Sequence, residues 1–207
     1  MFEQGKFHEF EGELLPRVSW ILEVMMPEKC KECLQKAAAR NALRLLENQR
    51  RGLERGSAVD QWAKAYLCDR KMLDIDGAYL PFIQRLRGWI DRKRLEWGEA
   101  EILTDVLIGD TVRHYAGHPD FLIHDGKRRI VLELKTTRHK PTACAKDRAA
   151  MQSLAYANPW EADSAIALHV SPYGIFEAAM ERNDRRWQHY AQQWDRAVTT
   201  FNRGRFD

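Results

Sequence analysis

Three charged residues in the middle of the chain have the types and spacing to bind a divalent cation. Asp120 follows Pro119, and Glu133 and Lys135 occupy alternate positions of the apolar segment 130–135. Because side chains alternate across a strand, Glu133 and Lys135 point to one face. Mg²⁺ prefers carboxylate oxygens, and a neighbouring lysine can orient a water or stabilise charge on a phosphate. The alternative is a surface hairpin whose Glu–Lys pair contributes at most roughly 1 kcal/mol.

The segment 115–135 that carries these residues is typical of two strands joined by a tight turn. Phe121 and Ile123 alternate with their neighbours in the first strand, and the second strand is apolar except for its two charges. Asp125-Gly126 favours a two-residue type I′ turn, which needs positive φ at both central positions. We therefore expect Asp120 to lie within reach of the second strand.

Helical patterns dominate the residues before this hairpin. After a polar stretch at 1–15, interpreted as a flexible arm, the spacing predicts helices over 28–49 and 76–96. Between them, Arg50–Gly56 indicates a break, and Ser57 is a plausible N-cap for a second helix. Asp60 then falls in a first turn, where an exposed aspartate is ordinarily favourable with the helix dipole.

The remaining elements alternate between strands and helices. We expect strands at 101–108, 164–170 and 175–180, a helix over 142–158, and a terminal helix beginning near Asn183 or Asp184. Thr136 and Thr137 begin a basic, hydroxyl-rich loop after the lysine strand. Arg148, Gln152 and Tyr156 recur at four-residue steps and share one helix face. That face is either a solvated surface or a set of donors turned toward phosphates at the hairpin.

Composition limits the class of protein without choosing a function. The chain has 207 residues, of which 44% are hydrophobic and 30% charged, as in globular proteins, and its net charge of +3 is compatible with nucleic acid but does not argue for it. No apolar run is long enough to span a membrane, and no signal peptide opens the chain, so we expect a cytoplasmic protein. Cys30-x-x-Cys33 lacks a second metal-binding pair at useful spacing, so we expect free thiols in a reducing compartment.

Taken in order, these motifs resemble the PD-(D/E)XK nuclease superfamily. Pro119-Asp120 matches its first motif, Glu133-Leu134-Lys135 its second, and Gln152-Ser-Leu-Ala-Tyr156 the Gln-x-x-x-Tyr signature of the RecB-like branch. Within this branch the chain is most similar to the mitochondrial genome maintenance exonuclease and its phage relatives. Arg55-Gly56-Ser57-Ala58-Val59 resembles the start of their Gly-Thr-x-x-His helix.

The resemblance implies an α/β fold with a restriction-endonuclease-like core. Its central mixed β-sheet has about five strands and is flanked by helices. Residues 1–98 would form an N-terminal helical region covering the active site, and residues 99–207 the nuclease core, together as one compact unit.

The resemblance also implies a metal-dependent DNA nuclease that hydrolyses phosphodiester bonds, most similar to phage-encoded exonucleases. Its substrates would be single-stranded DNA ends, in replication, recombination or repair within a bacterial or phage-infected cell. The catalytic residues would be Asp120, Glu133 and Lys135. Mg²⁺ or Mn²⁺ would be bound by Asp120, Glu133, the backbone carbonyl of Leu134, Asp60 and Asp105. DNA would be contacted by Arg148, Gln152, Tyr156, Thr136 and Thr137.

One departure from the relatives leaves a second function open. Asp60 stands where they carry a histidine that reaches a metal; aspartate is a harder ligand that still suits Mg²⁺ or Mn²⁺. The substitution also fits a catalytically inactive nuclease-fold protein that binds DNA. No cysteine follows Cys144, whereas iron–sulfur members of the branch place three near the C-terminus, so no iron–sulfur cluster is expected.

Overall fold

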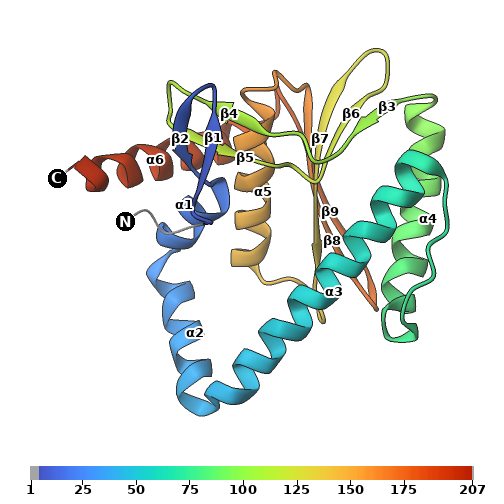
Figure 1. Cartoon of the computed structure of the whole chain (residues 1–207), viewed down its shortest axis with the longest axis horizontal. Helices are drawn as coiled ribbons and strands as arrows, with labels where there is room; N and C mark the ends of the chain where they lie inside the picture. Colours follow the sequence, from blue (N-terminus) through green and yellow to red (C-terminus); the bar gives the residue numbers. More distant parts are fainter. Residues whose placement is uncertain (1–4, 207) are drawn as a thin grey trace.

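A five-stranded mixed sheet forms the centre of the molecule (Figure 1). The computed structural model describes residues 5–206. The strands, in spatial order, are β3 Glu101–Leu103, β6 Phe121–His124, β7 Arg129–Thr136, β8 Ser164–Ser171 and β9 Gly174–Glu181. β7 and β8 are parallel, and the other neighbours are antiparallel. The predicted α/β class is confirmed, and the sheet with its flanking helices is consistent with a nuclease-like core.

Helices cover both faces of this sheet (Figure 1). α1, α5 and α6 lie on one face, while α4 and the C-terminal half of α3 lie on the other. Their bounds are α1 Val18–Val24, α3 Ala42–Asp69, α4 Leu80–Trp97, α5 Ala143–Ala157 and α6 Arg185–Phe206, with a 3₁₀ turn at Gly77–Tyr79 before α4. Alternate residues of β7 enter separate apolar clusters, Val131 on the α5 side and Leu132 on the α3–α4 side. Glu133 and Lys135 therefore share the α5 side with Val131.

Two small antiparallel sheets border this core. One pairs β1 (Phe7–Phe10) with β2 (Glu13–Pro16), and the other pairs β4 (Ile108–Asp110) with β5 (Tyr115–Gly117). The expected flexible arm is therefore wrong from residue 7 onward, while residues 1–4 lie outside the described residues. The Phe10 ring anchors this hairpin against Gly109, where an added Cβ would come within 2.6 Å of the ring.

The predicted strand at 101–108 is wrong, because the chain forms two short strands there that belong to different sheets. Asp105 lies between β3 and β4 with a φ of 59°. A residue in this left-handed region cannot continue an extended strand. The interruption turns the chain from the edge of the central sheet toward the β4–β5 pair.

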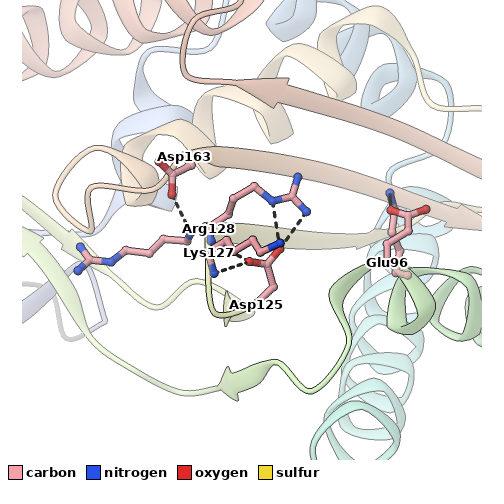
Figure 2. A network of polar contacts seen from close by, with 7 residues as sticks. Glu96, Asp125, Lys127, Arg128 and Asp163 are labelled. Atoms are coloured by element: carbon pink, nitrogen blue, oxygen red, sulfur yellow. Dashed lines mark hydrogen bonds and ion pairs between the residues drawn. The ribbon is translucent and has the colours of Figure 1, made fainter.

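The tight two-residue turn of the central hairpin is also wrong. His124 pairs with Arg129, which leaves a four-residue loop at 125–128, and within it only Gly126 has positive φ. The Asp125 carboxylate accepts hydrogen bonds from the backbone N–H groups of Lys127 and Arg128 and from the Arg128 guanidinium (Figure 2). An Asp side chain that satisfies the loop backbone replaces the type I′ geometry.

The N-terminal helices differ from their predicted bounds. α2 spans Glu28–Arg40, and α3 begins at Ala42, where the Asn41 side chain accepts a hydrogen bond from the backbone N–H of Arg44. α3 continues through Gly52 and Gly56, so the predicted break and the Ser57 cap are wrong. A mid-helix glycine costs only about 1 kcal/mol relative to alanine, and ion pairs four residues apart offset part of that cost.

The predictions for the second half of the chain hold better. α5, β8, β9 and α6 lie within about two residues of their expected bounds, and Trp187, Trp194 and Phe201 bury the apolar stripe of α6. The division at residue 98 stays a prediction, although α1, before that point, packs in the α5-side cluster. Residue 207 lies outside the described residues.

A disulfide joins Cys30, at the start of α2, to Cys144, at the start of α5. The expectation that all four cysteines are free thiols is wrong for this pair, while Cys33 and Cys68 are free and exposed. The bridged residues are 114 positions apart, so no local spacing indicates the pairing. Within residues 5–206, no helix combines the length and hydropathy that crossing a bilayer requires.

Candidate active site

Asp120 and Glu133 face each other across neighbouring strands. The β6–β7 register pairs Phe121 with Leu132, so the next position along places Asp120 opposite Glu133. The Asp120 Oδ2 atom accepts a hydrogen bond from the backbone N–H of Leu134 at 2.7 Å, which fixes the carboxylate beside β7. The expected proximity of Asp120 to the lysine strand is therefore found.

Glu133 is the most deeply buried acid of the site, with a side chain only 1% exposed. Its Oε1 atom accepts a hydrogen bond from Lys135 Nζ at 2.5 Å, whereas Oε2 is buried and has no hydrogen-bond partner among the described residues. An exposed surface pair, the alternative raised by the sequence, is wrong. The Lys135 side chain keeps 36% exposure, so the ammonium can still meet a substrate.

Burial and mutual repulsion disfavour two negative charges at this position. Burial, followed by the charge of Glu133, raises the pKa of Asp120 to about 8. Burial likewise raises the pKa of Glu133. Burial alone would lower the pKa of Lys135, but the charges of Glu133 and Asp120 outweigh this effect and raise the pKa. Two carboxylates that resist ionising together are strongly stabilised by an added cation.

Asp60 brings a third carboxylate to the site from α3. Its Oδ2 atom lies 3.2 Å from Lys64 Nζ, and its Oδ1 atom is buried without a partner in the described structure. Burial raises the pKa of Asp60, and its charge in turn raises the pKa of Asp120 and Glu133. The alternative of an exposed first-turn aspartate is wrong, because Asp60 lies deep within α3 and its side chain is only 28% exposed.

Asp105 belongs to the edge of the site rather than to its centre. Its side chain is 74% exposed, and its Oδ1 atom accepts a hydrogen bond from Lys64 Nζ at 2.6 Å, which lowers its pKa. Lys64 thus links Asp105 to Asp60. The sequence patterns do not assign a role to Lys64, although its position four residues after Asp60 was a signal for an ion pair.

α5 presents its polar face to the carboxylates. Tyr156 is 3% exposed and approaches Gly117, where an added Cβ would lie 2.8 Å from the phenol oxygen. Burial and the charge of Glu133 raise the pKa of Tyr156, while a hydrogen bond with Gln152 opposes that shift. Arg148 is half-buried, and its charge acts on Lys135. Tyr156 thus lies toward the carboxylates rather than in solvent, while the interpretation of this face as a set of phosphate donors stays a prediction.

The two threonines after β7 are held by other parts of the chain. Thr136 accepts hydrogen bonds from Arg55 at its hydroxyl, at 3.2 Å, and at its carbonyl, at 3.5 Å. Thr137 donates its hydroxyl hydrogen to the carbonyl of His139. Arg55 thereby ties α3 to the end of the lysine strand, a contact across 81 residues that no local pattern indicates.

The donor set fits a hard divalent cation. Mg²⁺ and Mn²⁺ take oxygen ligands, and two buried carboxylate oxygens, Glu133 Oε2 and Asp60 Oδ1, lack partners among the described residues. Both carboxylates now pair with lysines through their other oxygen. In residues 5–206, no three His, Cys, Asp or Glu side chains are grouped closely enough to hold a metal ion by themselves. While the lysines keep these contacts, one oxygen of each carboxylate is open to a cation.

Comparisons with known proteins give only distant similarities. No protein-family model matches the chain, and no curated protein is similar to it in sequence. Among solved structures, the chain is similar to SSO0001, at 21% identity over 59% of this chain with a TM-score of 0.36, and it spans 60% of that protein's length. It is also similar to an alkaline exonuclease from Laribacter hongkongensis, at 14% identity over 70% of this chain and 83% of that protein, with a TM-score of 0.35. Neither similarity is close enough to assign a function, which depends instead on the side chains of the site.

Proposed function

We propose that this protein is a Mg²⁺- or Mn²⁺-dependent deoxyribonuclease that hydrolyses phosphodiester bonds. The observation that carries the proposal is the pair of the part-buried Asp120 and the buried Glu133, with Lys135 beside it. One Glu133 oxygen has no hydrogen-bond partner in residues 5–206. A structural role alone gives no reason to withdraw two repelling acids from water on adjacent strands.

Asp120 and Glu133 would hold the cation, together with the carbonyl of Leu134 and Asp60. When bound there, the cation would neutralise charge on the phosphate and lower the pKa of the attacking water. Lys135 would donate a hydrogen bond to that water and stabilise the negative charge that develops during in-line attack. Asp105, held through Lys64, would help to orient Asp60.

Residues of α5 and the loop after β7 would position the nucleic acid. Gln152 supplies N–H donors on this face, and the buried Tyr156 phenol holds Gln152 through their hydrogen bond. Arg148, one turn earlier, lies close enough to Lys135 for their charges to interact. Thr136 and Thr137 stand at the end of β7, where a flanking phosphate would lie. Arg148 is the strongest candidate for a direct phosphate contact, because a guanidinium binds phosphate through two parallel N–H groups.

The projecting elbow formed by α2 and the first half of α3 supports a polynucleotide substrate (Figure 1). Residues 28–55 contain eight basic and four acidic side chains, and the segment 41–54 is almost entirely exposed. This excess of positive charge next to the site favours a phosphate backbone. We propose that the elbow covers the site and selects single-stranded DNA ends, which makes the protein an exonuclease.

Cleavage of end-labelled single-stranded, duplex and circular DNA with Mg²⁺ or Mn²⁺ tests this function. We expect the single-stranded linear DNA to be degraded and Lys135→Ala to abolish cleavage. The matched control is Lys127→Ala, in the loop at the far end of the same hairpin, which should leave activity unchanged. Full activity of Lys135→Ala, or DNA binding in EDTA with no cleavage in Mn²⁺, would refute the proposal, the second result pointing to a DNA-binding protein instead.

A further inference from the structure

His169 is a buried polar residue that the proposed function leaves without a role. It lies on β8 with 3% of its surface exposed, and neither ring nitrogen has a hydrogen-bond partner in the part of the chain that the structure describes. A neutral imidazole carries one donor and one acceptor, and leaving both unpaired in the interior is unfavourable. An apolar side chain would avoid this penalty, so the presence of histidine calls for a physical reason.

The sheet register places His169 beside Lys135. In the parallel β7–β8 pair, Lys135 is matched with His169 and Glu133 with Ala167. Residues matched in this way project from the same face of the sheet. On the opposite side, His169 is matched with Phe176 of β9. The methyl group of Ala167 is too small to separate His169 from the Glu133–Lys135 pair. These three polar side chains therefore form one continuous polar stretch beneath α5.

The charges around His169 keep its ring neutral. Burial, followed by the charges of Lys135 and Lys146, lowers its pKa to about 4. At neutral pH the ring therefore retains one unprotonated nitrogen, which can accept a hydrogen bond.

Lys135 needs such an acceptor if Glu133 is to bind a cation through both of its oxygens. Its ammonium donates to Glu133 Oε1 at 2.5 Å, so only Oε2 is open to a divalent cation while this contact lasts. An ammonium that gives up this partner in a largely buried site is strongly disfavoured unless another acceptor is close. Asp60 Oδ1 also lacks a partner among the described residues, but the proposed site assigns it to the cation. His169 therefore supplies the neighbouring acceptor that the cation does not use.

We propose that His169 is a positioning residue whose unprotonated ring nitrogen accepts a hydrogen bond from Lys135 when Glu133 binds a divalent cation. This inference rests on the proposed function, because it takes Glu133 as a cation ligand. The exchange frees both Glu133 oxygens and keeps the Lys135 ammonium within the site, where it can donate a hydrogen bond to the attacking water.

Calorimetric titration of the full-length protein with Mn²⁺ tests this exchange through a double-mutant cycle. We expect His169→Leu to weaken Mn²⁺ binding about tenfold, because Lys135 then stays on Glu133. His169→Gln, which keeps an acceptor, should bind within about threefold of the wild type. In a Lys135→Met background, where there is no ammonium to move, His169→Leu should change the affinity less than about twofold. The exposed His189→Leu is the matched control.

Thermal unfolding in EDTA separates positioning from a structural role. If His169 serves Lys135, His169→Leu keeps or raises the melting temperature, because it removes two unpaired polar atoms. A purely structural role predicts a lower melting temperature and the same loss of affinity in both backgrounds, and that result would overturn the inference.

The failure of this inference is distinguishable from the failure of the proposed function. Mn²⁺ binding that requires Asp120 but is unaffected by His169→Leu would overturn the role of His169 alone. No Mn²⁺ binding by the wild type, or binding that Asp120→Asn leaves unchanged, would overturn both.

Discussion

Asp120→Asn should make the protein more stable at alkaline pH while it removes a cation ligand. The folded protein raises the pKa of this carboxyl from 3.8 to about 8. Between these values the folded protein keeps a proton that the unfolded chain has released, so stability falls as pH rises. Asparagine has nearly the same size and shape as aspartate but carries no charge, and its side-chain carbonyl can still accept the hydrogen bond from the backbone N–H of Leu134.

The magnitude follows from the shift. Each pKa unit corresponds to about 1.4 kcal/mol, so the full shift is an upper limit of about 6 kcal/mol. Between pH 7 and 8.5, linkage gives a loss of about 1 kcal/mol for a folded pKa near 8. Over this window the stability advantage of Asp120→Asn over the wild type should grow by that amount. Buried histidines with lowered pKa values, such as His169, change the stability only below about pH 6.5, so they do not affect the comparison between pH 7 and 8.5.

Urea unfolding in EDTA at pH 7 and 8.5 measures this difference. The control is Asp74→Asn, at an exposed aspartate between α3 and α4, which should parallel the wild type. If Asp120→Asn also parallels the wild type across the window, or is destabilised more at pH 8.5, the electrostatic account of the site is wrong.

Two further predictions concern the supports of the site. Gly117→Ala should displace the Tyr156 phenol, because the new Cβ would lie 2.8 Å from the phenol oxygen. We expect the cleavage rate, measured by single-turnover kinetics, to fall about 10–100-fold. The free energy of unfolding, measured in urea, should fall by about 1–3 kcal/mol. Cys30→Ser should release the start of α2 from Cys144, so limited proteolysis should cut α2 faster. The bridge closes a loop of 114 positions, and chain entropy therefore limits the loss in free energy of unfolding to about 4–5 kcal/mol.

Each of these changes has a matched control. Gly174→Ala introduces a Cβ that, apart from its neighbours in the chain, has no atom of the described residues within 4 Å, and it should leave cleavage unchanged. Cys33→Ser removes an exposed free thiol from the same helix as Cys30 and should leave the proteolysis rate unchanged. Equal effects in a variant and its control would contradict the contacts from which the predictions are drawn.

The sequence predicts the central hairpin because its signals are local. Glu133 and Lys135 share a face simply because strands alternate, and Asp120 faces Glu133 because the two strands are adjacent in the chain. Gln152 and Tyr156 lie on one helix face for the same kind of reason. Periodicity of 2 or 3.6 residues carries this information without any knowledge of tertiary contacts.

Contacts between distant segments are what the sequence does not reveal. Arg55 meets Thr136 across 81 residues, and Cys30 meets Cys144 across 114. The continuation of α3 through Gly56, where the sequence predicts a break, is a related case. A glycine is only a weak helix-breaking signal, and the packing of Trp62 and Tyr66 against the sheet stabilises the rest of the helix. No local pattern assigns a role to His169, and its position beside Lys135 is visible only through the β7–β8 register.

Asp120 and Glu133 sharing one divalent cation is the central claim, and crystals grown with Mn²⁺ test it most directly. An anomalous difference map should show one peak between the two carboxylates, within about 2.5 Å of an oxygen of each, and the peak should vanish in Asp120→Asn. A map with no peak at this position, or with manganese bound at carboxylates elsewhere in the chain, would contradict the account.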